Sequence, residues 1–317
     1  PSDASSYRVK EEIESWQAID PLERFAAELK RIGAMDDAAA ETIGEKTRVA
    51  MAKACRLATD LEASPRLDSE TIGDLMFSNR PRESYDEARD PELLLPHDDN
   101  PRVQALAKKS RAGIVDGKPV SKNKVFQYRD AIFEAILHRF EKDPTLVAYG
   151  EENRDWGGAF ACYRGLTESL PYHRLFNSPI SEAAIVGTAV GYGLEGGRAL
   201  VELMYCDFMG RAGDQIFNQL AKWQSMSAGI LEMPVVLRVS VGSKYGAQHS
   251  QDWCAVVSHI PGLKVVFPAT PYDAKGLLNT ALAGSDPVIF FESQRLYDIG
   301  ELFEPEVPAD YYEVPMG

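Results

Sequence analysis

Four groups of polar side chains in this chain have residue types that could carry acid–base chemistry. The acidic pair 151–152 follows a short apolar run, and Glu182 begins a segment of small and apolar residues. The third group is the stretch 204–208, Met-Tyr-Cys-Asp-Phe, and the fourth is a glycine-rich loop, 242–250, that contains His249. Histidine can transfer protons near neutral pH, and a carboxylate at the start of a buried helix is unusual. These groups are therefore the candidate site.

Each candidate also has a purely structural explanation. A glutamate in the first turn of a helix stabilises the helix dipole without any catalytic role. A lone histidine in a loop is often only a surface residue, and glycines make a loop mobile or let a ligand approach the backbone. The chain contains no GxxxxGK[ST] phosphate loop, no GxGxxG after a strand and no GxSxG. On the residues alone, both explanations of Glu182 and His249 stay open.

The elements that must position these residues alternate between strand and helix from Val125 onward. Short β-branched strands between helices predict an α/β fold, a parallel sheet covered by helices on both faces. Ligands in such folds lie beyond the carboxyl ends of the strands. The expected strands are residues 146–149, 199–204, 235–239, 264–267 and 288–291, and the expected helices are residues 125–140, 183–194, 207–229 and 272–282. The 183–194 helix is expected to be buried on most faces.

The remaining parts of the chain are a helical segment and two linkers. Residues 1–77 are predicted to be helical, because Asp20-Pro21 is a helix-start pair and Gly33 is placed to end that helix. A second helix is expected from about Asp36 to Leu61. Residues 78–124 are rich in proline and predict a linker. The predicted domain covers residues 125–298, and the acidic, proline-rich residues 299–317 predict a linker toward a further C-terminal domain.

Composition excludes several classes of protein. The net charge of −14 and the pI near 4.9 argue against a nucleic-acid-binding protein, whose footprint is basic. No apolar run reaches membrane-spanning length, so no membrane association is expected. The four cysteines are scattered without a zinc-type spacing, which fits a reducing cytoplasm. Pro1 stands where an initiator Met is absent, and no signal-peptide run follows it, so we expect a processed or cut cytoplasmic chain.

Residues 125–317 resemble the β subunit of the decarboxylating first component of 2-oxo acid dehydrogenase complexes, from the transketolase-like superfamily. The resemblance rests on five motifs that occur in the same order. They are Gly150-Glu151-Glu152, Ser178-Pro179-Ile180-Ser181-Glu182, residues 214–219 (DQIFNQ), residues 247–251 (AQHSQ), and residues 261–268 (PGLKVVFP) leading to 273–277 (DAKGL). The resemblance implies the pyrimidine-binding domain of a thiamine diphosphate enzyme.

Residues 1–77 resemble a different part of the same component, the C-terminal end of the α subunit. The motifs are residues 5–8 (SSYR), 11–16 (EEIESW) and 20–25 (DPLERF). The implied protein is a fused α–β chain, in which residues 78–124 join the two parts. Its diphosphate-binding domain, with a Gly-Asp-Gly signature, is then expected before Pro1, and a C-terminal domain after Gly317.

The resemblance also implies roles for individual residues. Glu182 falls where the family glutamate hydrogen-bonds a ring nitrogen of the cofactor's aminopyrimidine and so promotes deprotonation of the thiazolium carbon. Met204 and Phe208 fall where the family packs an apolar residue and an aromatic ring on the pyrimidine. His249 falls where the family histidine faces the reacting carbon and assists reductive acylation of the lipoyl group. Core packing stays the alternative for Phe208.

The same resemblance implies two metal ions, potassium and magnesium. A structural potassium site, made largely of backbone oxygens, is implied at five positions. They are Val235, Ala281, Leu282, Gly284 and Asp286. Magnesium is held by the family's diphosphate-binding domain, so no magnesium ligand is expected in this chain.

The implied activity is oxidative decarboxylation of a branched-chain 2-oxo acid or pyruvate, with acyl transfer to lipoamide. The implied partners are the diphosphate-binding α-type domain and a lipoyl acyltransferase core, in an α2β2-like homodimer of fused chains. Two alternatives stay open. One is a non-oxidative enzyme of the transketolase type, and the other is a non-catalytic assembly fragment.

Overall fold

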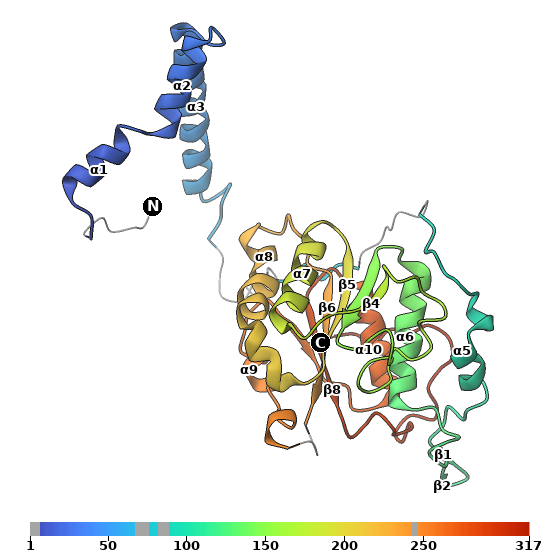
Figure 1. Ribbon diagram of the computed structural model, residues 1–317. Coiled ribbons are helices and arrows are strands. Elements are labelled where there is room, and N and C mark those ends of the chain that lie inside the picture. Colours follow the sequence, from blue (N-terminus) through green and yellow to red (C-terminus); the bar gives the residue numbers. More distant parts are fainter. Residues whose placement is uncertain (1–6, 67–75, 82–88, 243–245, 317) are drawn as a thin grey trace. The chain divides into compact units, whose positions relative to one another are not determined.

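The computed structural model describes residues 7–66, 76–81, 89–242 and 246–316. The chain divides into two compact units, Pro1–Ser69 and Glu70–Gly317 (Figure 1). Among the described residues, no helix is both long and apolar enough to cross a membrane.

The first unit consists of helices, as predicted. They are α1 (Lys10–Gln17), α2 (Pro21–Arg31) and α3 (Asp37–Thr59). Asp20 caps α2 by accepting a hydrogen bond from the Leu22 amide at 2.8 Å, and Asp36 caps α3 through the Ala39 amide at 2.7 Å. Gly33 ends α2 with a φ of +71°, a conformation that glycine adopts without strain. The caps and both helix boundaries therefore follow from local sequence.

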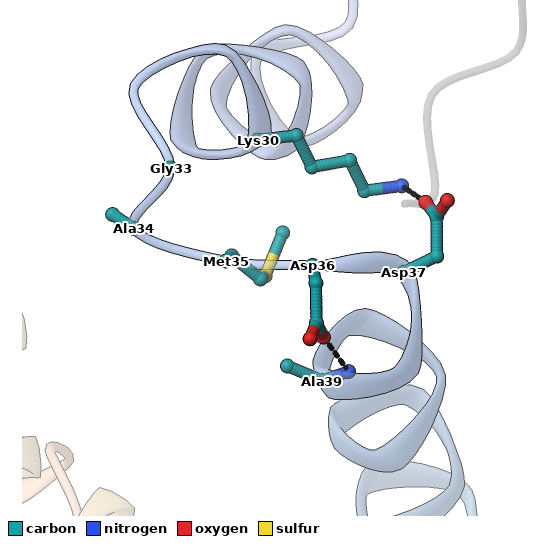
Figure 2. A pocket seen from close by; sticks show the side chains of 7 residues that line it. All are labelled: Lys30, Gly33, Ala34, Met35, Asp36, Asp37 and Ala39. Atoms are coloured by element: carbon teal, nitrogen blue, oxygen red, sulfur yellow. Dashed lines mark hydrogen bonds and ion pairs between the residues drawn. The ribbon is translucent and has the colours of Figure 1, made fainter.

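The turn between α2 and α3 forms a hollow of about 560 Å³ (Figure 2). The Lys30 ammonium in this hollow pairs with the Asp37 carboxylate at 2.6 Å, and the Asp36 carboxylate holds the helix cap. Both carboxylates are therefore engaged in holding the turn, and the hollow is a structural feature of the hairpin.

The second unit is built on one sheet of six parallel strands. The strands are β3 (Leu146–Gly150), β4 (Leu175–Asn177), β5 (Arg198–Leu203), β6 (Val235–Val241), β7 (Lys264–Val266) and β8 (Val288–Ser293). Their order across the sheet is β4-β3-β5-β6-β8-β7, and every neighbouring pair is parallel. The predicted parallel sheet is confirmed.

Helices cover both faces of this sheet (Figure 1). Helices α6 (Tyr128–Lys142) and α10 (Pro271–Ala283) pack with alternate strand residues such as Leu200 and Phe290 into one apolar core. Helix α7 (Glu182–Leu194) packs with the opposite alternate residues, such as Val201, into a second core. Strands buried on both faces explain the nearly continuous apolar runs of the sequence.

Two local expectations for this unit were wrong, and two short elements were not predicted. The predicted helix 207–229 is three pieces, a 3₁₀ helix Cys206–Ala212, a π-helix Gln215–Leu220 and α8 (Ala221–Met226). Glycines at 210 and 213 weaken the regular helix there. Helix α7 is buried on one face only, because Ala184, Thr188 and Gly191 are exposed. Strand β4 and helix α9 (Cys254–Ser258) are too short to show a periodic pattern.

The segment between the helical unit and the sheet contains short elements that pack on the second unit. They are a 3₁₀ turn (His97–Asp99), α5 (Pro101–Leu106) and the antiparallel pair β1 (Ile114–Val115) and β2 (Lys118–Pro119). Asn100 caps α5 and donates a hydrogen bond to the Gly165 carbonyl at 2.7 Å. At the other end of the unit, the Lys275 ammonium binds the carbonyls of Pro308 and Ala309 at 2.7 and 2.9 Å.

Arg198 and Asp143 form a fully buried ion pair at the start of strand β5. The Arg198 Nε lies 2.9 Å from the Asp143 carboxylate, and both side chains are 0% exposed. Replacing Asp143→Ala leaves a buried charge without its carboxylate, so we expect the free energy of unfolding to fall by about 3–5 kcal/mol. Urea denaturation of the chain measures this. The exposed pair Lys10–Glu14 provides the control, because Glu14→Ala should change the same quantity by less than about 0.5 kcal/mol; equal effects would contradict the prediction.

Candidate active site

The carboxyl ends of the parallel strands bring the predicted site residues to one edge of the sheet. Gly150 on β3 pairs with Glu202 on β5, and Glu202 pairs with Arg238 on β6. The segments that leave these three strands carry the acidic pair 151–152, the stretch 204–208 and the loop 242–250. The parallel topology therefore gathers groups that lie far apart along the chain.

Glu182 is the first residue of α7 and faces an open hollow of about 820 Å³. The side chain of Ser181, at the N-cap position, does not cap the helix but donates a hydrogen bond to the Pro179 carbonyl at 3.0 Å. Within the described residues, the Glu182 carboxylate makes no hydrogen bond or ion pair. The hollow is also lined by Phe208 and by small residues such as Ala183 and Gly210. We call this cavity the Glu182 hollow.

Phe208 connects the Glu182 hollow to the histidine. Its ring lies edge-on to the His249 ring, with 5.5 Å between centroids. The Tyr205 ring also lies against His249, at 4.4 Å. The structure therefore brings Glu182, Phe208 and His249 into one neighbourhood. Met204 is close by in the chain and its carbonyl accepts a hydrogen bond from the Ser240 hydroxyl, but its side chain does not line the hollow.

A second carboxylate lies close enough to Glu182 to interact with it. Burial raises the pKa of the Glu151 carboxyl, and the negative charges of Glu182 and Glu152 raise it further. Like charges that share a site favour the protonated form of one member. The raised pKa means that the Glu151 carboxyl keeps its proton to a higher pH than a solvent-exposed glutamate does.

Sequence reasoning missed a buried ionic triad beneath this edge. The Arg238 guanidinium binds the Glu202 carboxylate at 2.6 Å and the Glu292 carboxylate at 2.6 and 2.7 Å. The Tyr297 hydroxyl donates a further hydrogen bond to Glu292 at 2.7 Å. Burial raises the pKa of Glu202 to about 7, opposed by the Arg238 charge and assisted by Glu292. The available signal was the presence of Glu202, Arg238 and Glu292 inside three mainly apolar strands.

Four of the five predicted potassium ligands lie at the end of α10 and directly after it, and the fifth, Val235, begins β6. Ala281, Leu282 and Gly284 are at the C-terminal end of α10, where carbonyls lack helical partners, and Asp286 follows two residues later. However, Gly284 O already accepts a hydrogen bond from the Arg198 guanidinium at 2.6 Å. The Asp286 carboxylate pairs with Lys264 at 2.8 Å and accepts the amides of residues 78 and 79. Two of the five positions are thus engaged by the chain's own cations, and potassium stays a prediction.

The Glu182 hollow suits one half of a flat, polar heterocycle. A carboxylate without a protein partner among the described residues can accept or hold a proton at a ring nitrogen, and Phe208 offers a flat face for packing. Small residues leave the cavity open between them. The donor set therefore fits the pyrimidine end of thiamine diphosphate.

Comparisons with known proteins identify the family of this domain. Residues 124–299 match the family model described as the transketolase, pyrimidine binding domain. The chain is 45% identical over 199 residues to the beta subunit of acetoin:2,6-dichlorophenolindophenol oxidoreductase from Cupriavidus necator, covering 59% of this chain and 57% of that protein.

Two further relatives have names that refer to 2-oxo acids. The 2-oxoisovalerate dehydrogenase subunit beta of Bacillus subtilis is 40% identical over 195 residues, which cover 61% of this chain and 59% of that protein. The pyruvate dehydrogenase E1 component subunit beta of Acholeplasma laidlawii is 40% identical over 190 residues, which cover 59% and 57%. The chain spans less than two thirds of the length of each of these relatives.

The interaction between Glu151 and Glu182 predicts a measurable change in the pKa of Glu151 when Glu182 is replaced. Replacing Glu182→Gln removes a negative charge near Glu151, so ionisation of Glu151 becomes easier and its pKa should fall toward the ordinary glutamate value. Carboxyl ¹³C NMR titration of the chain measures this pKa. Glu195→Gln, at the opposite end of the same helix, is the control and should leave it unchanged. An unchanged pKa in Glu182→Gln would show that the two groups do not interact.

Proposed function

Because this chain belongs to the transketolase pyrimidine-binding domain family, we propose that it supplies the pyrimidine-binding half of a thiamine diphosphate-dependent 2-oxo acid dehydrogenase. The reaction is oxidative decarboxylation of a branched-chain 2-oxo acid or pyruvate, with transfer of the acyl group to lipoamide. The observation that carries the proposal is the Glu182 carboxylate facing an open hollow beside Phe208, at the carboxyl edge of a parallel sheet. The names of the 2-oxo acid dehydrogenase relatives support the substrate class.

In this proposal each side chain has a limited task. Thiamine diphosphate, when bound, supplies the electron sink that decarboxylation of a 2-oxo acid requires. The Glu182 carboxylate would hold a proton at the pyrimidine ring, and Phe208 would pack on the flat face of that ring. Met204 is the further apolar contact that the resemblance implies, although its side chain lies outside the Glu182 hollow. His249 transfers a proton on the side where the acyl group is passed on.

The second half of the site belongs to other domains. A diphosphate-binding α-type domain, in the same fused chain, would hold the diphosphate and magnesium, and potassium would have a structural role only. The partners are a lipoyl acyltransferase core and a second fused chain in an α2β2-like dimer. A cytoplasmic location is part of the proposal, and the four cysteines are all free thiols.

A second candidate substrate is acetoin, because one relative at 45% identity is named as an acetoin oxidoreductase subunit. The test is to assay the full-length protein with pyruvate, 2-oxoisovalerate and acetoin, using free lipoamide as the acyl acceptor and, separately, dichlorophenolindophenol as the electron acceptor. Acylation of lipoamide from a 2-oxo acid supports the proposal. Turnover of acetoin alone favours the second candidate, and ketol transfer without acylation identifies a transketolase-type enzyme.

Glu182 has a specific expected phenotype in the full-length protein. Glu182→Gln keeps the size and hydrogen-bonding capacity of the side chain but cannot exchange a proton, so decarboxylation should fall by roughly 10²–10⁴-fold. Calorimetry should still detect binding of thiamine diphosphate. Glu195→Gln serves as the matched control with wild-type turnover. Undiminished decarboxylation by Glu182→Gln would remove this residue from its proposed role.

The chain alone should bind the cofactor poorly. It contributes only the pyrimidine side, and the charged diphosphate gains no partner without the other domain. Isothermal calorimetry of the 317-residue chain with thiamine diphosphate and magnesium should therefore give a Kd weaker than about 100 µM, at which the binding free energy is small. Micromolar binding would contradict the division of the site between two domains.

A further inference from the structure

A row of aromatic rings lies beside the predicted histidine. The sequence analysis named the stretch that contains Tyr205, but the proposed function gives neither Tyr205 nor Phe160 a task. Tyr205 lies against His249, with ring centroids 4.4 Å apart and planes tilted by 40°. Phe160, from the segment between β3 and β4, meets Tyr205 edge-to-face at 6.0 Å. We call Tyr205 and Phe160 the aromatic wall. The Tyr205 ring of this wall and the Phe208 ring both lie against the His249 ring.

The aromatic wall is supported from behind by the buried ionic triad. Phe160 stacks on Tyr297 with 4.6 Å between centroids and planes only 13° apart. Tyr297 is 3% exposed, and its hydroxyl binds Glu292, which in turn binds Arg238. Phe160 therefore cannot move toward Tyr297 unless the Tyr297 ring moves too, and that ring is held by a buried hydrogen-bond network. On this side the position of the Phe160 ring is fixed by its packing.

Space does exist on another side of Phe160. This residue also lines a hollow of about 620 Å³, together with glycines 157 and 158 and several arginines. Neither Tyr205 nor His249 lines that hollow, so the space beside His249 is bounded by the Tyr205 ring itself. Truncating Tyr205 therefore removes the ring that covers this side of the imidazole.

We propose that Tyr205, backed by Phe160, is a specificity-determining residue that limits the acyl group to a small one. The inference rests on the proposed function, because His249 must face the reacting carbon. The substrate class is then 2-oxo acids with side chains of one or two carbons, such as pyruvate and 2-oxobutyrate, rather than branched-chain 2-oxo acids. Each methylene that a pocket rejects changes kcat/KM by about 10–200-fold, so a wall of two rings is sufficient for this discrimination.

The experiment compares substrates of increasing size in the full-length protein and in its Tyr205→Ala and Tyr205→Phe variants. The measurement is kcat/KM for pyruvate, 2-oxobutyrate, 2-oxoisovalerate and 4-methyl-2-oxopentanoate. The wild type should prefer pyruvate to 2-oxoisovalerate by at least about 10-fold. Tyr205→Ala should shift this ratio toward 2-oxoisovalerate by about 10-fold or more. Tyr205→Phe keeps the ring and should preserve the wild-type ratio within about 3-fold.

A second variant guards against loss of folding in Tyr205→Ala. Phe160→Leu removes the backing ring but keeps an apolar side chain, and it should shift the ratio in the same direction by a smaller factor. A wild type that prefers 2-oxoisovalerate, or an unchanged ratio in folded Tyr205→Ala or Phe160→Leu, overturns the inference and leaves the proposed function standing. A wild type that turns over none of the four acids overturns both.

A measurement on the ring contact itself complements the kinetics. The rate of diethyl pyrocarbonate modification of His249, read by peptide mass spectrometry, should rise several-fold in Tyr205→Ala and stay at the wild-type value in Tyr205→Phe, because only the alanine uncovers the imidazole. The other four histidines of the chain report on general unfolding. Equal rates at His249 in all three proteins would overturn the placement of Tyr205 against this ring.

Discussion

The buried guanidinium of Arg238 ties three strands together at the edge of the sheet where the candidate site lies. Glu202 on β5 and Glu292 on β8 bind it from either side, and all three side chains are almost completely buried. Removing such charges from water is expensive, and the cost is recovered only when their hydrogen bonds are made. A one-residue slip of any of these strands would turn a charge away from its partner. The register of the site-bearing edge therefore depends on this triad.

The contacts that lead from the triad to the site form a continuous path. Glu292 accepts a hydrogen bond from Tyr297, on which Phe160 stacks. Phe160 meets Tyr205, and Tyr205 lies against His249. The loop that carries His249 is thus bordered by rings whose positions are determined by buried polar bonds. Support of this kind would keep His249 oriented for the proton transfer proposed for it.

The segment after β5 shows how local irregularity can serve the same edge. A 3₁₀ helix carries Phe208, and a π-helix follows it before the regular turn of α8 begins. π-helical turns are rare and are frequent at functional sites. In this chain the irregular segment directs Phe208 toward both Glu182 and His249. A regular helix over the same residues, as the sequence pattern predicts, would present a different set of side chains.

Much of the fold was accessible from local patterns. The caps at Asp20 and Asp36, five of the six strands and the parallel α/β class follow from residue type and periodicity, because these depend on neighbours within a few positions. The five motifs in their order likewise identified the pyrimidine-binding domain family, which the match over residues 124–299 confirms. The individual roles of Glu182, Met204, Phe208 and His249 remain predictions.

Other features were decided by the tertiary structure. Arg238 finds its carboxylate partners 36 and 54 positions away, and no periodic pattern encodes such a pairing. The face of α7 that is buried, the broken helix after β5 and the aromatic wall beside His249 depend in the same way on distant residues. The sequence by itself determined most of the regular elements and the family that they build, because both depend on patterns of residues within a few positions of one another. Only the tertiary structure decided which side chains meet at the edge of the sheet, because those contacts exist only after distant strands have paired.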